Sequence, residues 1–176
     1  MDINLLVKLC ARAWATAILA AFHNGVPGRQ AALLGATGAG RTAFAQSLAH
    51  LQDLKLVMRN PGHGHPLRPE YRLTARGDVY AAIAARIEAA VPAKDEAALL
   101  RKAWTVPILA VAPKPTTFSH IRRTLPSLTD RALSLNLKTL QNINWLERSV
   151  DVESSPPKPI YKAANAGLRI SRACVG

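Results

Sequence analysis

The chain has 176 residues, 49% of them hydrophobic, and a net charge of +12 at pH 7 with a sequence pI of about 10.5. This length allows two modest cores, and the charge favours a polyanionic partner, nucleic acid or an anionic membrane surface, over a merely soluble basic protein. The two cysteines, Cys10 and Cys174, have no metal-ligand spacing, which argues against a disulfide framework and suits a reducing cytoplasm.

The first element is the apolar run from Ile3 to Phe22, whose length approaches that of a membrane span. Lys8 and Arg12 interrupt the run, and Asp2 stands where a signal peptide carries positive charge. We therefore expect a core helix from about Asp2 to Phe22 and no membrane association.

Residues 23–25 end this helix, and Pro27 opens a short segment through Leu34. After the glycine-rich stretch from Gly35 to Gly40, apolar residues recur at i, i+4 and i+7, which predicts a helix with one buried stripe. The stripe consists of Phe44, Leu48 and Leu51.

A hairpin and a final helix complete the first half. The hairpin is predicted as a strand over 56–58, a loop from Asn60 to Pro69 and a returning strand over 71–73. Thr74 is expected to cap the helix, with Gly77 in its first turn.

The second half has the same order of elements. Its first helix is predicted over 97–111, where Pro107 either kinks the helix or marks its first turn. The other predicted elements are helices over 118–125 and 129–142, the second with a stripe of Leu133, Leu137 and Leu140, a strand over 145–147, a loop over 154–159 and a strand over 160–163.

This correspondence extends to individual residues. Ala13, Trp14, Ile18, Leu19 and Ala20 recur ninety residues later as Ala103, Trp104, Ile108, Leu109 and Ala110. Pro69, Tyr71 and Gly77 recur at the same offset, whereas Leu48, Leu51, Gln52 and Arg59 recur at an offset of 89. A period of about ninety predicts two copies of one small domain, residues 1–93 and 94–176.

Helices followed by a two-stranded hairpin are typical of the winged helix-turn-helix domain, so we expect a mainly α fold with small β-hairpin wings, built from two tandem winged helix-turn-helix domains. Residues 12–88 and 101–170 resemble the HxlR-type branch of the MarR-like transcription regulators. The residues that carry the resemblance are Lys102, Ala103, Trp104, Thr105, Ile108, Leu109, Leu133, Ser134, Leu137 and Leu140, and Glu70, Tyr71, Arg72, Leu73, Thr74 and Gly77 in the first copy.

The pattern Tyr-x-Leu-Thr-x-x-Gly after the first wing is the most specific part of the resemblance, and the second copy departs from it over residues 161–167. The resemblance implies a domain that dimerises to read two half-sites, so this chain is expected to act as a single-chain pseudo-dimer. Some members of the family sense oxidants through a cysteine ahead of the first conserved helix. For Cys10 a buried, inert thiol is the favoured interpretation.

The predicted DNA-binding residues on the recognition helices have side chains suited to bases and phosphates. They are Arg41, Thr42, Gln46 and Ser47 in the first copy, and Thr129, Arg131, Ser134, Asn136 and Lys138 in the second. The wings and flanks add Arg59, His63, His65, Arg68, Arg72, Arg122, Arg123 and Lys158. In the second wing Asp151 and Glu153 are expected to weaken phosphate binding.

Two other kinds of site fit the sequence less well. The stretch from Gly35 to Thr42 approaches a phosphate-binding loop, with Arg41 in place of lysine, but it lacks the preceding buried strand, so a turn before a recognition helix explains it better. His63 and His65 have no third ligand at a useful spacing. The sequence offers no catalytic set, metal site or cofactor, and predicts that the chain is not an enzyme.

We therefore expect a bacterial-type transcription regulator that binds double-stranded DNA and is cytoplasmic and nucleoid-associated. A protein-interaction module that binds a partner subunit or a polymerase is the alternative. RNA polymerase or another regulator as a partner, and further homodimerisation, are left open.

Overall fold

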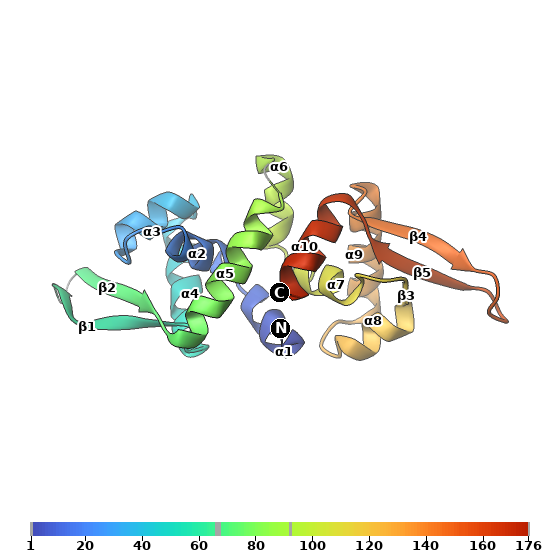
Figure 1. Ribbon diagram of the computed structural model, residues 1–176, viewed down its shortest axis with the longest axis horizontal. Helices are drawn as coiled ribbons and strands as arrows, with labels where there is room; N and C mark the ends of the chain where they lie inside the picture. The colour runs from blue at the N-terminus through green and yellow to red at the C-terminus, as the bar shows by residue number, and fades with distance from the viewer. Residues whose placement is uncertain (1, 66–67, 92, 176) are drawn as a thin grey trace.

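The structure, a computed structural model, describes residues 2–65, 68–91 and 93–175, with the backbone alone at residues 61–65, 68 and 94. It is mainly helical with two small antiparallel sheets, and the two sheets project from opposite ends of a helical body (Figure 1). The expected predominance of helix and the expected hairpins are both present.

The expectation of one helix from Asp2 to Phe22 is wrong. The chain forms α1 (Ile3–Cys10) and α2 (Ala15–His23), which are bent by 104° at the break between them. No single helix in the described part of the chain is long and apolar enough to cross a membrane, although α1 and α2 together meet the length and composition of a broken span.

The break in the helix lets α1 serve two cores. Leu5 and Leu9 pack with the first half of the chain, whereas Leu6 and Cys10 pack with the second half. A straight continuation of α1 could not also place the apolar residues of α2 in the first core, so tertiary packing overrides the uninterrupted helical pattern.

A helix-turn-helix pair follows, with α3 (Gln30–Thr37) and α4 (Arg41–Asp53). Gly38 ends α3 in the left-handed conformation, with φ +69°, and Gly40 is the N-cap of α4. The predicted stripe is confirmed, because its three side chains are buried. The glycine-rich stretch is therefore the end of one helix and the turn before the next.

The first wing is longer than expected. It consists of β1 (Val57–His65) and β2 (Arg68–Leu73), paired antiparallel with a shift in register between Arg59 and Gly64. The expectation of a loop over the whole of Asn60 to Pro69 is wrong, because pairing resumes beyond the register shift, Gly64 with Pro69 and His65 with Arg68, despite the local turn signals. A bridge between Arg29 and Glu70 adds a third segment beside β2.

The next helix, α5 (Ala75–Ala89), begins as expected. Thr74 Oγ1 accepts the N–H of Gly77 at 3.0 Å. Gly77 is needed at this position because a Cβ there would overlap the carbonyl oxygen of Leu56.

The expected helix over 97–111 is broken into three pieces, α6 (Lys94–Ala97), the 3-10 helix η1 (Ala98–Arg101) and α7 (Thr105–Val111). Pro107 is the third residue of α7, so it lies in the first turn, where its missing N–H costs no helical hydrogen bond.

The second helix-turn-helix pair is α8 (Phe118–Thr124) and α9 (Asp130–Asn142), and it is followed by α10 after the wing. A three-stranded sheet, in the order β3-β5-β4, contains this wing, whereas the sequence predicted only a pair of strands. Both strands of that pair are longer than predicted, and β5 begins inside the expected loop over 154–159. The remaining bounds are β3 (Thr116–Thr117), β4 (Leu146–Asp151), β5 (Lys158–Ala163) and α10 (Asn165–Val175).

The two halves share hydrogen bonds at equivalent positions. Leu56 N–H donates to Leu51 O at 3.0 Å, and Trp145 N–H donates to Leu140 O at 2.9 Å. The preceding residues, Lys55 and Asn144, both have positive φ, 56° and 58°. A pair of non-glycine residues with the same rare conformation at an offset of 89 residues indicates the same local fold.

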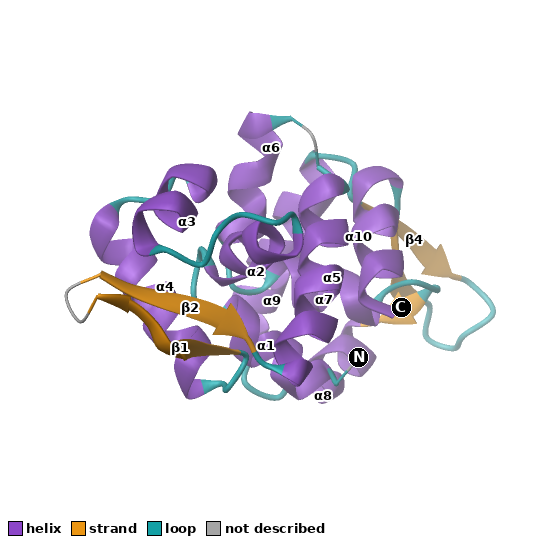
Figure 2. Cartoon of the chain, turned by 60° about the vertical axis from the view of Figure 1, so that its left-hand side comes forward, coloured by secondary structure: helices purple, strands orange, loops and turns teal. Residues whose placement is uncertain are grey.

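The halves meet along a seam in which α5 and α10 lie side by side (Figure 1). Ile83 and Ile87 of α5 belong to the core of the second half, whereas Tyr80 and Ala84 belong to that of the first. Figure 2 shows the first wing at one side of this helical body and β4 at the other. Shared helices thus fix the position of the first wing and helix-turn-helix pair relative to the second wing and pair.

Candidate nucleic-acid interface

The α4 helix exposes Arg41, Thr42 and Gln46, as the sequence predicts. Ser47 is different, since it is only 2% exposed. It lies four residues before Leu51 and therefore on the buried side of the helix. The prediction that Ser47 contacts DNA is wrong, because its side chain packs inside the protein.

The α9 helix exposes Arg131, Ser134 and Lys138. The side chains of two other predicted contact residues already form hydrogen bonds with the backbone of α9 itself. Thr129 caps it by accepting the N–H of Ala132 at 3.2 Å, and the half-buried Asn136 donates from Nδ2 to Ala132 O at 2.8 Å. The residues available for base contacts are therefore fewer than the sequence indicates.

Arg122 stabilises the turn between α8 and α9. Its Nε lies 2.6 Å from Asp130 Oδ1, and its Nη1 donates to Pro126 O at 3.0 Å. Arg123, the other predicted contact in α8, is exposed, and its Nη2 lies 3.3 Å from His120 Nδ1. Arg122 thus positions the helix-turn-helix pair, whereas Arg123 remains accessible to a phosphate.

In the first wing Arg59 and Arg72 are both exposed. Arg59 pairs with Tyr71 and Arg72 pairs with Met58, so the two arginines lie on opposite faces of the hairpin. A hairpin that carries cations on both faces can contact phosphates on both sides of a groove. The side chains of His63, His65 and Arg68 lie outside the described part of the chain.

The second wing alternates the sign of its charges. Lys158 is directly opposite Asp151, and Glu147 is opposite Lys162. Asp151 accepts a hydrogen bond from the Ser154 hydroxyl at 2.6 Å, and this bond is the main reason that the pKa of Asp151 is lowered. Because Asp151 stays ionised, this wing attracts phosphate less than the first wing does.

The alternative sites do not gain support. The stretch from Gly35 to Thr42 lies between two helices and not after a strand, so the context of a phosphate-binding loop is absent. Among the side chains that the structure describes, which do not include those of His63 and His65, no group of three or more histidine, cysteine or acidic residues could hold a metal ion.

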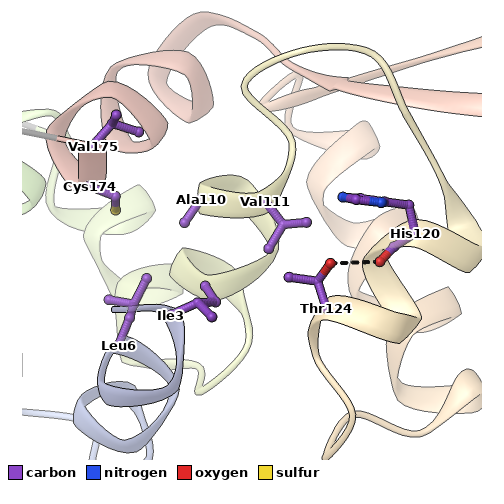
Figure 3. Close-up of a pocket in the computed structure, with 8 residues that line it drawn as sticks. All are labelled: Ile3, Leu6, Ala110, Val111, His120, Thr124, Cys174 and Val175. Carbon is purple, nitrogen blue, oxygen red and sulfur yellow. Dashed lines mark hydrogen bonds between the residues drawn. The ribbon is translucent and has the colours of Figure 1, made fainter. Parts of the chain in front are cut away.

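A cavity of about 300 Å³ lies between α1, α7, α8 and α10 (Figure 3). It is mostly apolar, with His120, Thr124 and Cys174 in its wall, and the Thr124 hydroxyl donates to the carbonyl of His120 at 2.9 Å.

Cys10 and Cys174 are both free and buried. Burial raises the pKa of the Cys10 thiol far above its ordinary value and that of Cys174 to about 12.

The second helix-turn-helix pair and its wing are similar to a known family. Residues 99–175 match the HxlR-like helix-turn-helix family model. HxlR-like proteins are helix-turn-helix transcription regulators, and the match suggests that the segment it covers binds DNA. A search of the curated proteins and a search of the solved structures found no match.

The HxlR-like segment runs from η1 to α10 and thus contains α8, α9 and the second wing. Sequence reasoning missed two residues, one on α9 and one between the two halves. Leu135 is an exposed apolar residue on α9, and Arg101 joins the halves through Glu88. The sequence carries a signal for Leu135, because it lies outside the stripe that Leu133 and Leu137 define.

Proposed function

We propose that the chain is a sequence-specific, double-stranded-DNA-binding transcription regulator in which two winged helix-turn-helix domains, residues 1–93 and 94–176, act as a single-chain pseudo-dimer. The match of residues 99–175 to the HxlR-like family supports DNA binding by the second half. The proposal extends this role to the first half and assigns α4 and α9 as the two recognition helices.

The equivalence of α4 and α9 carries the proposal. Both helices have 13 residues, and both follow a shorter helix and a turn. Both also lead into a wing through a left-handed residue at the equivalent position, Lys55 after α4 and Asn144 after α9. Gly77 and Gly167 provide further support, because a Cβ at either would overlap the carbonyl oxygen at the start of the preceding wing, that of Leu56 or Trp145.

The seam supports a fixed relation between the two domains. Residues from α1 and α5 contribute to both cores, and α10 packs on α5 (Figure 1). Two winged helices whose cores are joined by the same helices hold their recognition helices at a constant separation. A separation near one turn of duplex, on the order of 34 Å, would place them in successive major grooves.

Charge also supports a DNA partner. Residues 1–94 contain 11 basic and 5 acidic residues, and residues 95–176 contain 12 and 6, so each part carries six net positive charges. Phosphate neutralisation by such charges releases counterions from DNA, which makes affinity depend strongly on salt.

The second wing favours a protein partner as an additional contact. Val150 and Val152 are 47% and 77% exposed, and Asp151 adds negative charge between them. This surface is less suited to phosphate than the first wing, so we add RNA polymerase or another regulator as a proposed partner of the second wing. DNA binding by the recognition helices does not require this contact.

Titration of labelled duplex at several salt concentrations tests the proposal. We expect the logarithm of the association constant to fall steeply and linearly with the logarithm of salt concentration. In addition, Arg131→Ala and Gln46→Ala are expected to change the preferred sequence, because both side chains are exposed on the proposed recognition helices. A nearly flat dependence of affinity on salt would overturn the proposal. So would variants that lose the same affinity for every duplex sequence.

A further inference from the structure

The two proposed recognition helices differ at one equivalent position. Gly40 is the N-cap of α4 and Thr129 is the N-cap of α9, so the sixth residue of each helix is Gln46 in α4 and Leu135 in α9. The buried stripes follow the same offset, which places Gln46 and Leu135 at the same angle around their helices. One helix therefore has an amide where the other has an aliphatic side chain.

Leu135 is 65% exposed. On the same side of α9, Arg131 precedes it by four residues and Lys138 follows it by three, and both are exposed. Leu135 is the only large hydrophobic side chain with substantial exposure among the described residues of α4 and α9. An apolar protein surface would match Leu135 but not the two cations beside it. A polyanion that presents one small apolar group matches all three side chains.

We propose that Leu135 contacts the 5-methyl group of a thymine in the half-site of α9, whereas Gln46 binds an adenine at the equivalent position in the half-site of α4. This inference rests on the proposed function. The thymine methyl is the apolar group that the major groove presents, and adenine offers the donor and acceptor that a glutamine amide can pair with. Lys138 would hold a neighbouring phosphate, which helps to fix the depth of α9 in the groove, and Arg131 would contact a base one turn away.

The consequence is a site that departs from two-fold symmetry at this position. A homodimer has the same residue on both helices and selects the same base in both half-sites. Here the amide and the aliphatic side chain impose different bases.

The experiment uses the full chain and a duplex selected from a random pool. Each thymine in the selected site is replaced singly by deoxyuridine, which removes only the methyl group, and the dissociation constant is measured. For one thymine we expect binding to weaken about fourfold, the effect of losing contact with one methyl group. Leu135→Ala is expected to weaken binding by a similar factor and to be insensitive to that replacement.

Val79→Ala is the matched control, because Val79 is a 60% exposed aliphatic residue on α5, outside both recognition helices and both wings. This variant should keep the full sensitivity to the methyl group. Leu135→Gln, which copies Gln46, should shift the selected base toward adenine. Thermal unfolding of each variant checks that the exposed substitutions leave the fold intact.

Selective binding with no sensitivity to any single methyl group would overturn the inference and leave the proposed function standing. If Leu135→Ala bound the selected duplex as tightly as the wild type does, the inference would also be overturned, even if the variant had lost the binding of a protein. Failure to enrich any duplex would overturn the proposed function, and the inference with it.

Discussion

Arg101 and Glu88 form a two-pronged ion pair, with Nη1 2.6 Å from Oε1 and Nη2 2.9 Å from Oε2. Thr16 donates its hydroxyl to the same Oε1 at 2.8 Å, and the ring centroid of Trp14 lies 4.7 Å from the guanidinium carbon of Arg101. Arg101 follows residue 93, whereas its three partners precede it. The cluster therefore links the two proposed domains.

Glu88→Gln is expected to lower the free energy of unfolding by about 2 kcal/mol. The side chains of Arg101 and Glu88 are 19% and 20% exposed, and breaking such a pair leaves a poorly solvated cation. Asp130→Asn is the control, because the pair of Asp130 with Arg122 is more exposed and its loss should cost less than about 1 kcal/mol. Urea unfolding measures both changes, and equal stability of wild type and Glu88→Gln would contradict the role of the pair.

Gly77→Ala and Gly167→Ala are each expected to destabilise the protein by more than about 2 kcal/mol, because the added Cβ must displace a backbone carbonyl. Gly35→Ala is the matched control. Gly35 is an exposed helical residue with nothing near its Cβ position, so alanine should stabilise the helix by about 0.5–1 kcal/mol. Thermal unfolding distinguishes the two outcomes, and a harmless Gly167→Ala would argue against the packing of α10 on Trp145.

The two thiols are expected to react with a disulfide reagent only after unfolding. Burial raises the pKa of Cys174 to about 12 and that of Cys10 further, so both thiols stay protonated in the folded protein near neutral pH. Thiol titration at pH 8 with and without urea checks this. Rapid modification of either cysteine in the folded chain would contradict it.

The same shifts predict a dependence of stability on pH. In the unfolded chain the thiols ionise near the ordinary pKa of 9.0, whereas in the folded chain they ionise only at higher pH. Their contribution to stability is thus fully present below pH 9.0 and is lost as the pH rises toward about 12. The loss of stability above pH 9.0 should be smaller in a variant with both Cys10→Ala and Cys174→Ala.

Arg59→Ala and Arg72→Ala are each expected to weaken binding to all duplexes alike and to reduce the salt slope by about 0.9, the value for one phosphate contact. Arg172→Ala is the control, because Arg172 is an exposed arginine beside the seam of α5 and α10. Fluorescence anisotropy over a range of salt concentrations measures the slopes. A changed sequence preference with an unchanged slope would assign these arginines to base contacts.

Local patterns predicted the elements whose buried faces follow one period. The existence of α4 and the range of α9, predicted as 129–142 and observed as Asp130–Asn142, follow from stripes at helical spacing, and Thr74 caps α5 as the sequence predicts. These features depend on residues within a few positions of each other, so a single sequence contains the necessary information.

Features that depend on tertiary packing were not predictable in the same way. The break between α1 and α2 contains neither glycine nor proline, and it exists because neighbouring residues Leu5 and Leu6 pack in different cores. Ser47 is polar but buried, because its angle on α4 decides its environment. The pairing of Arg101 with Glu88 depends on how the two halves meet, which no local pattern specifies.

The stoichiometry of the complex with a selected duplex tests the central claim most directly. Selection from random duplexes gives the site, and sedimentation equilibrium gives the number of chains bound to it. We predict one chain on a site with two unlike half-sites whose centres lie about 10 base pairs apart, one for α4 and one for α9. Two chains on a palindromic site, with a single half-site for each chain, would contradict the single-chain pseudo-dimer.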